Sequence, residues 1–398
     1  MSTTREVVIT GAVRSAIGSY GGGLRDVSLG DLAASVLRES VKRAGVDPEQ
    51  VGHVVFGNVI HTEPRDMYLS RVAAVNGGLP HSTPALTLNR LCGSGLQAIV
   101  SAADYIRKGE ADCVVGGGAD AMSRAPYWLP TGRWGQRMGD GTMLDAMVGA
   151  LTDPFDKCHM GITAENIAGK WGISREDQDA LAAQSHQRAV HAIAEGRFRE
   201  QILPVEIKTR KGVVVFETDE NPREDISLDG LARMKPVFKR DGGTVTAGNA
   251  SSLNDGAAAV TMMEAGAAER AGLTPLGRLV DATVAAVDPK YMGIGPVPAV
   301  KMLLERTGVG RDRIDVWEIN EAFAAQALAV CRDLELDMDK VNPNGSGISL
   351  GHPIGATGAN LTVKALYELA RTGGRYAVVT MCIGGGQGIA ALYERVNR

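Results

Sequence analysis

Long apolar runs are missing from this sequence, and aromatic residues make up only 5% of it. No apolar run approaches the roughly 18 residues that a membrane-spanning helix needs, so we expect no membrane partner. Met1–Arg5 leads into an apolar segment without the pattern of a signal peptide. The five cysteines form no Cys-x-x-Cys pair and are odd in number, which favours free thiols in a reducing compartment. We therefore expect a cytoplasmic protein.

Excess charge is also missing, because the formal net charge is only -4. This balance gives no electrostatic reason to expect a nucleic-acid partner. Hydrophobic residues reach 44%, and glycine is abundant at 50 residues. A chain of 398 residues exceeds the size of one hydrophobic core, so two or three domains are expected. The composition is typical of a tightly packed α/β enzyme with many short turns.

Two parts of the chain read as copies of one α/β unit, because Gly45-Val46 and Gly308-Val309, which follow similar helices, are 263 positions apart. The first copy predicts helices and strands, in alternation, at Leu29–Ala44, Val51–Phe56, Leu96–Arg107 and Cys113–Val115. The second copy predicts them at Pro298–Thr307, Ile314–Ile319, Ala359–Arg371 and Tyr376–Thr380. We expect a capping box at Ser28–Asp31 and glycine turns at Gly116–Gly118 and Gly384–Gly386. Alternating helices and strands predict mainly parallel sheets covered by helices.

A stretch of different character separates the copies, and the chain is divided accordingly. Residues 1–121 with 253–274 form the predicted N-terminal half, and residues 275–398 form the C-terminal half. Residues 122–252 are predicted to be an inserted loop domain that lies over the core, where substrate contacts concentrate. It contains a charged helix from Arg175 to Glu195 and a segment rich in Met, Trp, Arg and Gly at Trp128–Asp145.

Cys92 stands at a glycine-rich turn that opens a helix, in the run Asn89–Ala98. A helix N-terminus stabilises a thiolate, so we expect a lowered pKa and a nucleophilic sulfur. Gly93 and Gly95 would let the atoms of another molecule approach the backbone closely. The alternative is a buried cysteine that only packs. It is disfavoured because three other residues of the chain have the chemistry of a catalytic site.

Cys382, His352 and Asn320 are these three residues. Cys382 ends a predicted strand, and Asn320 follows one, at the sheet edge where ligands bind in α/β folds. His352 lies in an irregular turn between Gly351 and Pro353, which is unusual for a core histidine. Thiol, base and oxyanion donors together favour acyl transfer. A dinucleotide site is disfavoured because no G-x-G-x-x-G opens a helix, and adjacent Cys and His near position 158 lack metal-ligand spacing.

These segments closely resemble the thiolase family over essentially the whole chain. The resemblance is carried by Asn89–Gly95, His159-Met160-Gly161, Gly248–Ser251, Asn320–Gln326, Gly351–Gly355 and Cys382–Gly386. It implies a five-layered α-β-α-β-α sandwich of two similar halves plus a loop domain. It also implies a reversible Claisen condensation of acyl-CoA thioesters, acetyl-CoA among them, to 3-ketoacyl-CoA and CoA, with no tightly bound cofactor and no metal.

The resemblance also implies individual roles. Cys92 would take the acyl group with His352 as its base, and Cys382 would remove the α-proton of the second acyl-CoA. Asn320 would hold a water that forms an oxyanion hole with His352, and the N–H groups of Cys92 and Gly384 would form another. The CoA contacts implied in this way are Ser251, His159, Leu151, Met160, Phe238, Ala322, Phe323 and, near the adenine, Arg223.

Two further expectations concern assembly and specificity. Trp128–Asp145 corresponds to a tetramerisation loop in relatives, so a homotetramer is expected, with a flexible lid as the alternative. Asn344–Ser349 departs from the small apolar run of some members, which puts strict two-carbon specificity in doubt. The rival functions are a decarboxylating condensing enzyme, which needs no second cysteine, and a non-catalytic carrier, which would lack a catalytic residue. Acyl chain length and physiological direction stay open.

Overall fold

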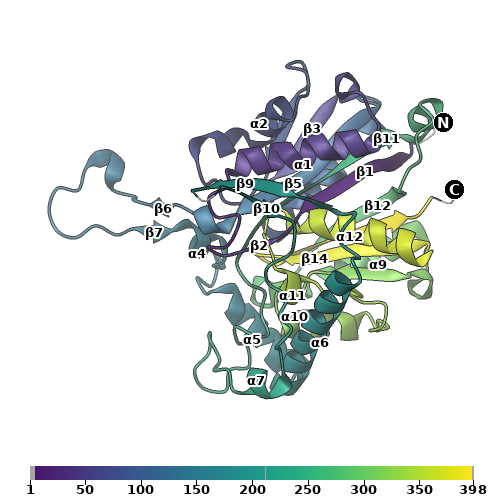
Figure 1. Ribbon diagram of the computed structural model, residues 1–398. Helices are drawn as coiled ribbons and strands as arrows, with labels where there is room; N and C mark the ends of the chain where they lie inside the picture. Colours follow the sequence, from purple (N-terminus) through teal and green to yellow (C-terminus); the bar gives the residue numbers. More distant parts are fainter. Residues whose placement is uncertain (1–4, 211, 397–398) are drawn as a thin grey trace.

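Strands that are far apart in the sequence lie side by side in one 11-stranded sheet (Figure 1). The computed structural model describes residues 5–210 and 212–396. The strands of the sheet are β1 (Val7–Ser15), β2 (Gly18–Ser19), β3 (His53–Gly57), β4 (Ala85–Leu88), β5 (Cys113–Ala121), β8 (Ile202–Leu203), β11 (Asn254–Glu264), β12 (Gly277–Ala286), β13 (Val316–Ile319), β14 (Tyr376–Ile383) and β15 (Gln387–Glu394). Their order is β13-β14-β15-β12-β1-β11-β5-β3-β4, with β2 paired to β11 and β8 paired to β1.

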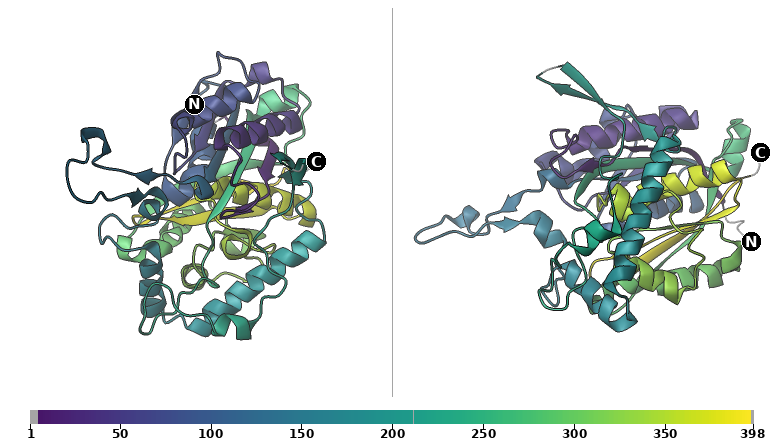
Figure 2. Two further views of the ribbon diagram at one scale, coloured as in Figure 1. Left: turned by 60° about the vertical axis from the view of Figure 1, so that its left-hand side comes forward. Right: turned by 60° about the horizontal axis from the view of Figure 1, so that its bottom comes forward.

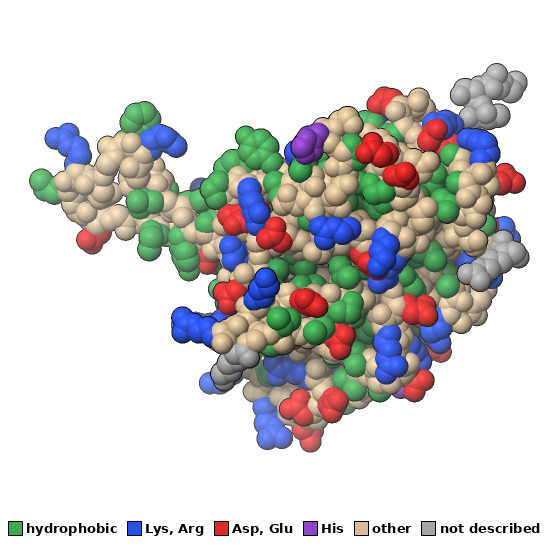
Figure 3. All heavy atoms as spheres, turned by 45° about the horizontal axis from the view of Figure 1, so that its top comes forward, with side chains coloured by type: hydrophobic (Ala, Val, Ile, Leu, Met, Phe, Trp, Pro, Cys, Tyr) green, Lys and Arg blue, Asp and Glu red, His purple; other side chains and the backbone are tan. Residues whose placement is uncertain are grey.

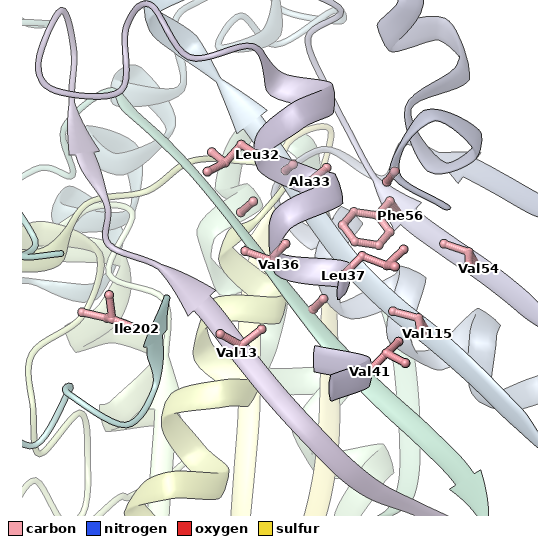
Figure 4. Close-up of a cluster of buried hydrophobic side chains, with 14 of the residues drawn as sticks. Val13, Leu32, Ala33, Val36, Leu37, Val41, Val54, Phe56, Val115 and Ile202 are labelled. Carbon is pink, nitrogen blue, oxygen red and sulfur yellow. The ribbon is translucent and has the colours of Figure 1, made fainter. Parts of the chain in front are cut away.

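Three layers of helices alternate with the strands of the two halves. The helices of the two halves are α1 (Leu29–Ala44), α2 (Leu69–Asn76), α3 (Ser94–Arg107), α8 (Ala265–Arg270), α9 (Pro296–Thr307), α10 (Ala324–Asp333), α11 (Gly347–Leu350) and α12 (Thr357–Thr372). Leu37 of α1 packs with Val13 and Phe56 in the first core (Figure 4). A second core places α3 and α12 between strands of both halves, and a third packs α9 and α10 on the far side. The predicted five-layered sandwich is confirmed.

The expectation of mainly parallel strands is wrong. Parallel pairs join β3 to β4 and β5, β13 to β14, and β8 to β1, whereas all other neighbours are antiparallel. The reason at the C-terminal end is a tight turn, in which Gly385 and Gly386 take φ values of 81° and 83°. This left-handed conformation suits glycine and folds β15 back beside β14.

The first triple glycine is part of a strand, not the turn that the sequence suggested. Gly116–Gly118 lies inside β5, where other backbone approaches it closely. A Cβ on Gly116 would lie 2.7 Å from Ile99 Cα, and one on Gly117 would lie 2.4 Å from Ala258 O. Glycine is needed here because α3 and β11 pack directly on this strand.

Helix ends follow the sequence, except at one cap. Gly45 and Gly308 end α1 and α9 in the left-handed conformation, with φ values of 67° and 64°. The capping box expected at Ser28 is absent: its hydroxyl donates to Glu63 Oε1 over 2.6 Å instead of capping the helix. α3 begins two residues earlier than predicted, at Ser94, and α9 begins at Pro296.

Residues 122–252 leave and rejoin the sheet at neighbouring strands, because Ala121 of β5 pairs with Asp255 of β11. The division of the chain into two halves and an insertion stays a prediction, and the name insertion is used below for residues 122–252. The insertion contains β6 (Tyr127–Trp128), β7 (Leu144–Asp145), α4 (Ala146–Ala150), α5 (Met160–Trp171), α6 (Arg175–Ala194), β9 (Val205–Thr209), β10 (Gly212–Phe216) and α7 (Leu228–Ala232). α6 is the predicted charged helix. No helix within the described ranges is long and apolar enough to cross a membrane.

A long arm projects from the insertion, away from the body of the molecule, in every view (Figures 1 and 2). β6 and β7 pair at its base, and the chain between them forms the tip. Trp134 and Met138 near the tip are 86% and 92% exposed. Apolar side chains are therefore displayed on the arm rather than packed (Figure 3).

Candidate active site

A cavity of about 490 Å³ lies between the two halves and the insertion, and it contains most of the predicted site. Among the predicted residues, those that line it are Cys92, Leu151, His159, Met160, Phe238, Ser251, Ala322, Phe323, His352 and Gly384. Most of its wall is apolar, as suits an acyl chain and the arm of a thioester. Residues that sequence reasoning did not select, among them Met122, Met147, Met292 and Ile354, complete the wall.

Cys92 sits in a 3-10 turn, η3 (Leu91–Gly93), that leads directly into α3. The neighbouring glycines admit the protein's own atoms rather than those of a ligand. A Cβ on Gly93 would lie 2.7 Å from Ile383 Cδ1, and one on Gly95 would lie 2.9 Å from Gly355 O. The turn that carries the thiol is thus packed against the C-terminal half.

The expected lowering of the Cys92 pKa is wrong. Burial raises it to about 11, although hydrogen bonds from the backbone N–H groups of Gly384 and Cys92 act in the opposite direction. Desolvation of a thiolate outweighs the favourable field of the helix N-terminus. Cys92 is therefore a thiol near neutral pH, and it needs a base.

His352 is buried, and each of its ring nitrogens takes part in a hydrogen bond. Its Nδ1 lies 2.6 Å from Thr357 Oγ1, and the Thr357 hydroxyl is placed to donate to Pro353 O over 2.9 Å. Since that hydroxyl has one proton, Nδ1 carries the ring proton and donates to Thr357. Nε2 is then the unprotonated nitrogen, 3.3 Å from Asn320 Nδ2, which donates to it. Burial lowers the His352 pKa to about 4, so the ring is a neutral base at pH 7.

Thr357 and Asn254 are site residues that sequence reasoning missed. Asn254 Oδ1 accepts the His352 backbone N–H over 2.8 Å. A signal for Thr357 was present, since the 263-residue offset aligns it with Ser94, whose hydroxyl donates to Leu91 O over 2.7 Å. Each hydroxyl lies at the start of a helix beside a predicted catalytic residue.

Asn320 and Cys382 meet at one edge of the sheet, as their places in the sequence predicted. The parallel strands β13 and β14 place Ile319 beside Thr380, so both residues lie just beyond this pair. Both side chains are buried behind the cavity wall. Burial raises the pKa of the Cys382 thiol well above its usual range, and the charge of Cys92 raises it further. Ile383, the residue after Cys382, packs on Gly93, the residue after Cys92, so the two thiols lie on adjoining segments.

The residues predicted to contact CoA lie mainly at α5 and on loops beside it. His159 caps α5, because its Nδ1 accepts the Gly161 N–H over 3.0 Å, and its ring stacks on Phe238 at 4.6 Å. Ser251 is fixed by its own N–H, which donates to Ala322 O over 2.9 Å. Arg223 does not line the cavity: its side chain is exposed and its N–H is bound to His186. Its contact with adenine stays a prediction.

Residues 344–349 lie beside the site but behind Asn320, outside the cavity wall. Ser346 Oγ donates to Ile319 O over 2.9 Å, and a Cβ on Gly347 would lie 2.6 Å from Asn320 Oδ1. This segment thus supports Asn320 rather than contacting an acyl chain. Any selection by chain length in the cavity falls to the wall residues instead.

Comparisons with known proteins agree over the whole length. Residues 7–266 match the thiolase N-terminal domain, and residues 273–395 match the thiolase C-terminal domain. The chain is 63% identical over 393 residues to beta-ketothiolase BktB of Cupriavidus necator, covering 99% of this chain and 100% of that protein.

Solved structures give the same result. The crystal structure of the Bacillus anthracis acetyl-CoA acetyltransferase has a TM-score of 0.97 and 47% identity, covering 100% of both chains. Human mitochondrial 3-ketoacyl-CoA thiolase in complex with CoA has a TM-score of 0.96 and 43% identity, covering 99% of both chains. Taken with a thiol, a neutral histidine, an asparagine and a second thiol at one cavity, these matches establish that the chain belongs to the thiolase family.

Proposed function

We propose that this protein is an acetyl-CoA C-acyltransferase, a β-ketothiolase that joins two acyl-CoA molecules reversibly into 3-ketoacyl-CoA and CoA. One observation carries the proposal: a cavity-lining thiol, Cys92, and a buried thiol, Cys382, stand on adjoining segments beside a histidine that is neutral. One thiol suffices for simple acyl transfer. A second thiol supplies the proton acceptor that carbon–carbon bond formation requires.

In the first step, the Cys92 sulfur attacks the carbonyl carbon of an acyl-CoA. His352 Nε2 takes the thiol proton, a carbon–sulfur bond forms, and the bond to the CoA sulfur breaks. The proton on His352 then passes to the CoA thiolate, which leaves as a thiol. The high pKa of Cys92 supports a step in which attack and proton removal are coupled.

In the second step, the Cys382 thiol gives its proton to His352 Nε2, and the resulting thiolate removes an α-proton from a second acyl-CoA. The resulting enolate attacks the acyl carbon on Cys92, a carbon–carbon bond forms, and the acyl bond to sulfur breaks. The Cys92 thiolate then takes the proton from His352 while Cys382 keeps the α-proton, which restores both thiols and the neutral histidine. Neither step requires a redox change.

Two sets of donors are proposed to stabilise the negative oxygens. The backbone N–H groups of Cys92 and Gly384 would bind the oxygen of the tetrahedral intermediate, and both already act on the Cys92 sulfur. A water held by Asn320, together with the protonated Nε2 of His352, would bind the enolate oxygen. Removal of one such donor typically costs about 3 kcal/mol of transition-state stabilisation.

CoA thioesters are the proposed substrates, and no tightly bound cofactor is proposed. The pantetheine arm would pass Ser251 and His159, between Met160, Phe238 and Phe323. Leu151 and Ala322 would complete the apolar walls, and Arg223 would reach the adenine end from the surface. The apolar rings and methyl groups here suit the aliphatic part of such an arm.

The first test is covalent. Brief incubation with acetyl-CoA should leave one acetyl group on the peptide that contains Cys92, measured by mass spectrometry after proteolysis. His352→Ala should slow this labelling, because the thiol then lacks its base. An acetyl group found on the Cys382 peptide instead would reverse the two roles.

A decarboxylating condensing enzyme is the second candidate, favoured by the hydrogen-bonded pair of His352 and Asn320. Such a pair suits the polarisation of a malonyl group, and that reaction needs no second cysteine. Faster product formation from malonyl-CoA than from acetyl-CoA, unaffected by Cys382→Ser, would favour this candidate over a thiolase.

A further inference from the structure

Asp120 has no part in the mechanism above, yet its carboxylate joins a loop of the N-terminal half to the loop that carries His352. It lies near the end of β5 and is completely buried. Its Oδ1 accepts hydrogen bonds from Asn58 Nδ2 over 2.8 Å and from the Ile60 N–H over 3.1 Å. Its Oδ2 accepts the Gly355 N–H over 2.6 Å, and the Val59 N–H lies 3.3 Å from it. One carboxylate therefore connects a loop of the N-terminal half to the loop of His352.

Close packing makes this connection rigid. A Cβ on Gly355 would lie 2.4 Å from Asp120 Oδ2, and one on Gly118 would lie 2.2 Å from Gly355 O. A Cβ on Gly95 would lie 2.9 Å from the same oxygen. Gly355 is thus enclosed between Asp120 and the start of α3, three residues from His352, and Gly95 is three residues from Cys92.

The negative charge of Asp120 is also not balanced by a cationic side chain in the described residues. Among the residues of the two described ranges, no lysine or arginine forms a salt bridge with Asp120. Its charge raises the pKa of Cys92, and the nearby Asp66 acts on Asp120 as a like charge. Burial raises the Asp120 pKa to about 7, while hydrogen bonds from Ile60, Gly355 and Val59 lower it. The hydrogen bonds thus offset part of the cost of burying the charge.

We propose that Asp120 is a positioning residue of this site, which fixes the loop of His352 against the N-terminal half. Its charge also favours the protonated form of the Cys92 thiol. The inference rests on the proposed function, because a retained thiol proton is the one that His352 delivers to departing CoA. Loss of that proton to solvent would leave the CoA thiolate without a donor. Asp120 would thereby couple acylation to proton transfer without touching the substrate.

The test compares neutral and charged variants by alkylation of Cys92 with iodoacetamide across pH, followed on the Cys92 peptide by mass spectrometry. Asp120→Asn keeps the shape and removes the charge, so the alkylation midpoint of Cys92 should move to lower pH. The kcat for cleavage of acetoacetyl-CoA by CoA should fall at least 10-fold, with KM changed less than 3-fold. Asp120→Glu, which keeps the charge, should keep the alkylation midpoint while lowering kcat.

Asp255→Asn is the matched control, since Asp255 is a buried carboxylate on the neighbouring strand that accepts the Ser123 N–H over 2.9 Å. It should leave the Cys92 midpoint and kcat unchanged. An unmoved or raised midpoint in folded Asp120→Asn, or an equal shift in Asp255→Asn, would overturn the proposal.

The wild-type protein provides a measurement that does not depend on a variant folding. Below its pKa, an isolated thiol is alkylated at a rate whose logarithm rises with pH with a slope of one. Ionisation of Asp120 should produce an inflection in this line near pH 7. His352, with a pKa of about 4, and Cys382, with a strongly raised pKa, titrate outside this window. A straight line between pH 5.5 and 9 would also overturn the proposal. Alkylation needs no CoA substrate, so failure of acetyl transfer is a separate result.

Discussion

At Cys92, two opposing effects on one sulfur decide the chemistry. The sequence showed the helix that follows this residue, and therefore the effect that favours a thiolate. It did not show the packing of Ile383 on Gly93 and of Gly355 on Gly95, which surrounds the turn with protein atoms. Burial is the larger effect, so the resting group is a thiol and the neutral His352 becomes necessary.

The second thiol gives the sharpest prediction for a single residue. Cys382→Ser removes a group that a neighbouring base can ionise, because a serine hydroxyl is far less acidic than a thiol. Acetylation of Cys92 should proceed as in the wild type, while condensation of acetyl-CoA slows at least about 100-fold. Rapid-quench mass spectrometry measures the first and a coupled assay for acetoacetyl-CoA measures the second. Near-normal condensation would contradict the two-thiol mechanism.

Thr357 gives a prediction about the tautomer of His352. Thr357→Val keeps the volume but removes the hydroxyl that accepts from Nδ1, so the ring loses the partner that keeps Nε2 basic. The kcat should fall about 10- to 100-fold with KM nearly unchanged, as for other losses of an orienting partner. Thr362→Val, in the same helix, removes a hydroxyl bonded to Gly358 O and should leave kcat unchanged. Equal effects of both changes would indicate a general loss of helix packing.

At the scale of elements, helix α6 carries a pH-dependent contact. The buried His186 accepts the Arg223 N–H at Nδ1 over 3.1 Å, and burial lowers its pKa from 6.5 to about 4. A folded pKa below the unfolded value means that the unfolded chain binds the proton first. The contribution of His186 to stability is therefore complete above pH 6.5 and is lost as the pH falls toward 4.

His186→Gln should accordingly weaken the dependence of stability on acid. Urea midpoints measured at pH 7.5 and pH 4.5 should differ less in the variant than in the wild type. The wild-type difference also includes His352, which changes in the same direction. A variant with the full wild-type difference would show that His186 binds its proton as readily in the folded chain as in the unfolded chain.

The helices and strands differed in how well their bounds and roles could be predicted from the sequence. The helices and most strands were predictable because apolar periodicity and terminal glycines such as Gly45 and Gly308 are local signals. The role of Gly116–Gly118 was not, since a strand that needs close backbone contact and a turn both favour glycine. The predicted cap at Ser28 was wrong for a similar reason, because the Ser28 hydroxyl donates its hydrogen bond to Glu63, which is remote in the sequence.

The site was predictable in its members but not in its electrostatics. Motifs around Cys92, His352 and Cys382 named the residues, and the cavity holds most of those named with them. Pairing with Asn254 and Thr357, and the burial that sets each pKa, depend on contacts between the two halves. Those contacts exist only in the folded chain.

At the scale of the whole molecule, the arm predicts the assembly. Trp134, Met138 and Met143 are 86%, 92% and 67% exposed, which favours an apolar contact with another copy of the chain. We expect a homotetramer of two dimers. Deletion of residues 130–137 should leave dimers, as measured by light scattering, with thiolytic activity within about threefold of the wild type. A full-length protein that runs as a monomer would contradict this expectation.

The position of β11 in the sheet has a consequence for how the chain folds while the ribosome synthesises it. β11 is the strand between β1 and β5, yet residues 122–252 are synthesised before it. The first half therefore exposes two unfilled strand edges throughout translation of the insertion, which is a hazard for aggregation. Nascent chains that end near residue 200 should be sensitive to protease and bound by chaperones. Chains extended beyond residue 264 by the length of the exit tunnel should become resistant as the sheet closes.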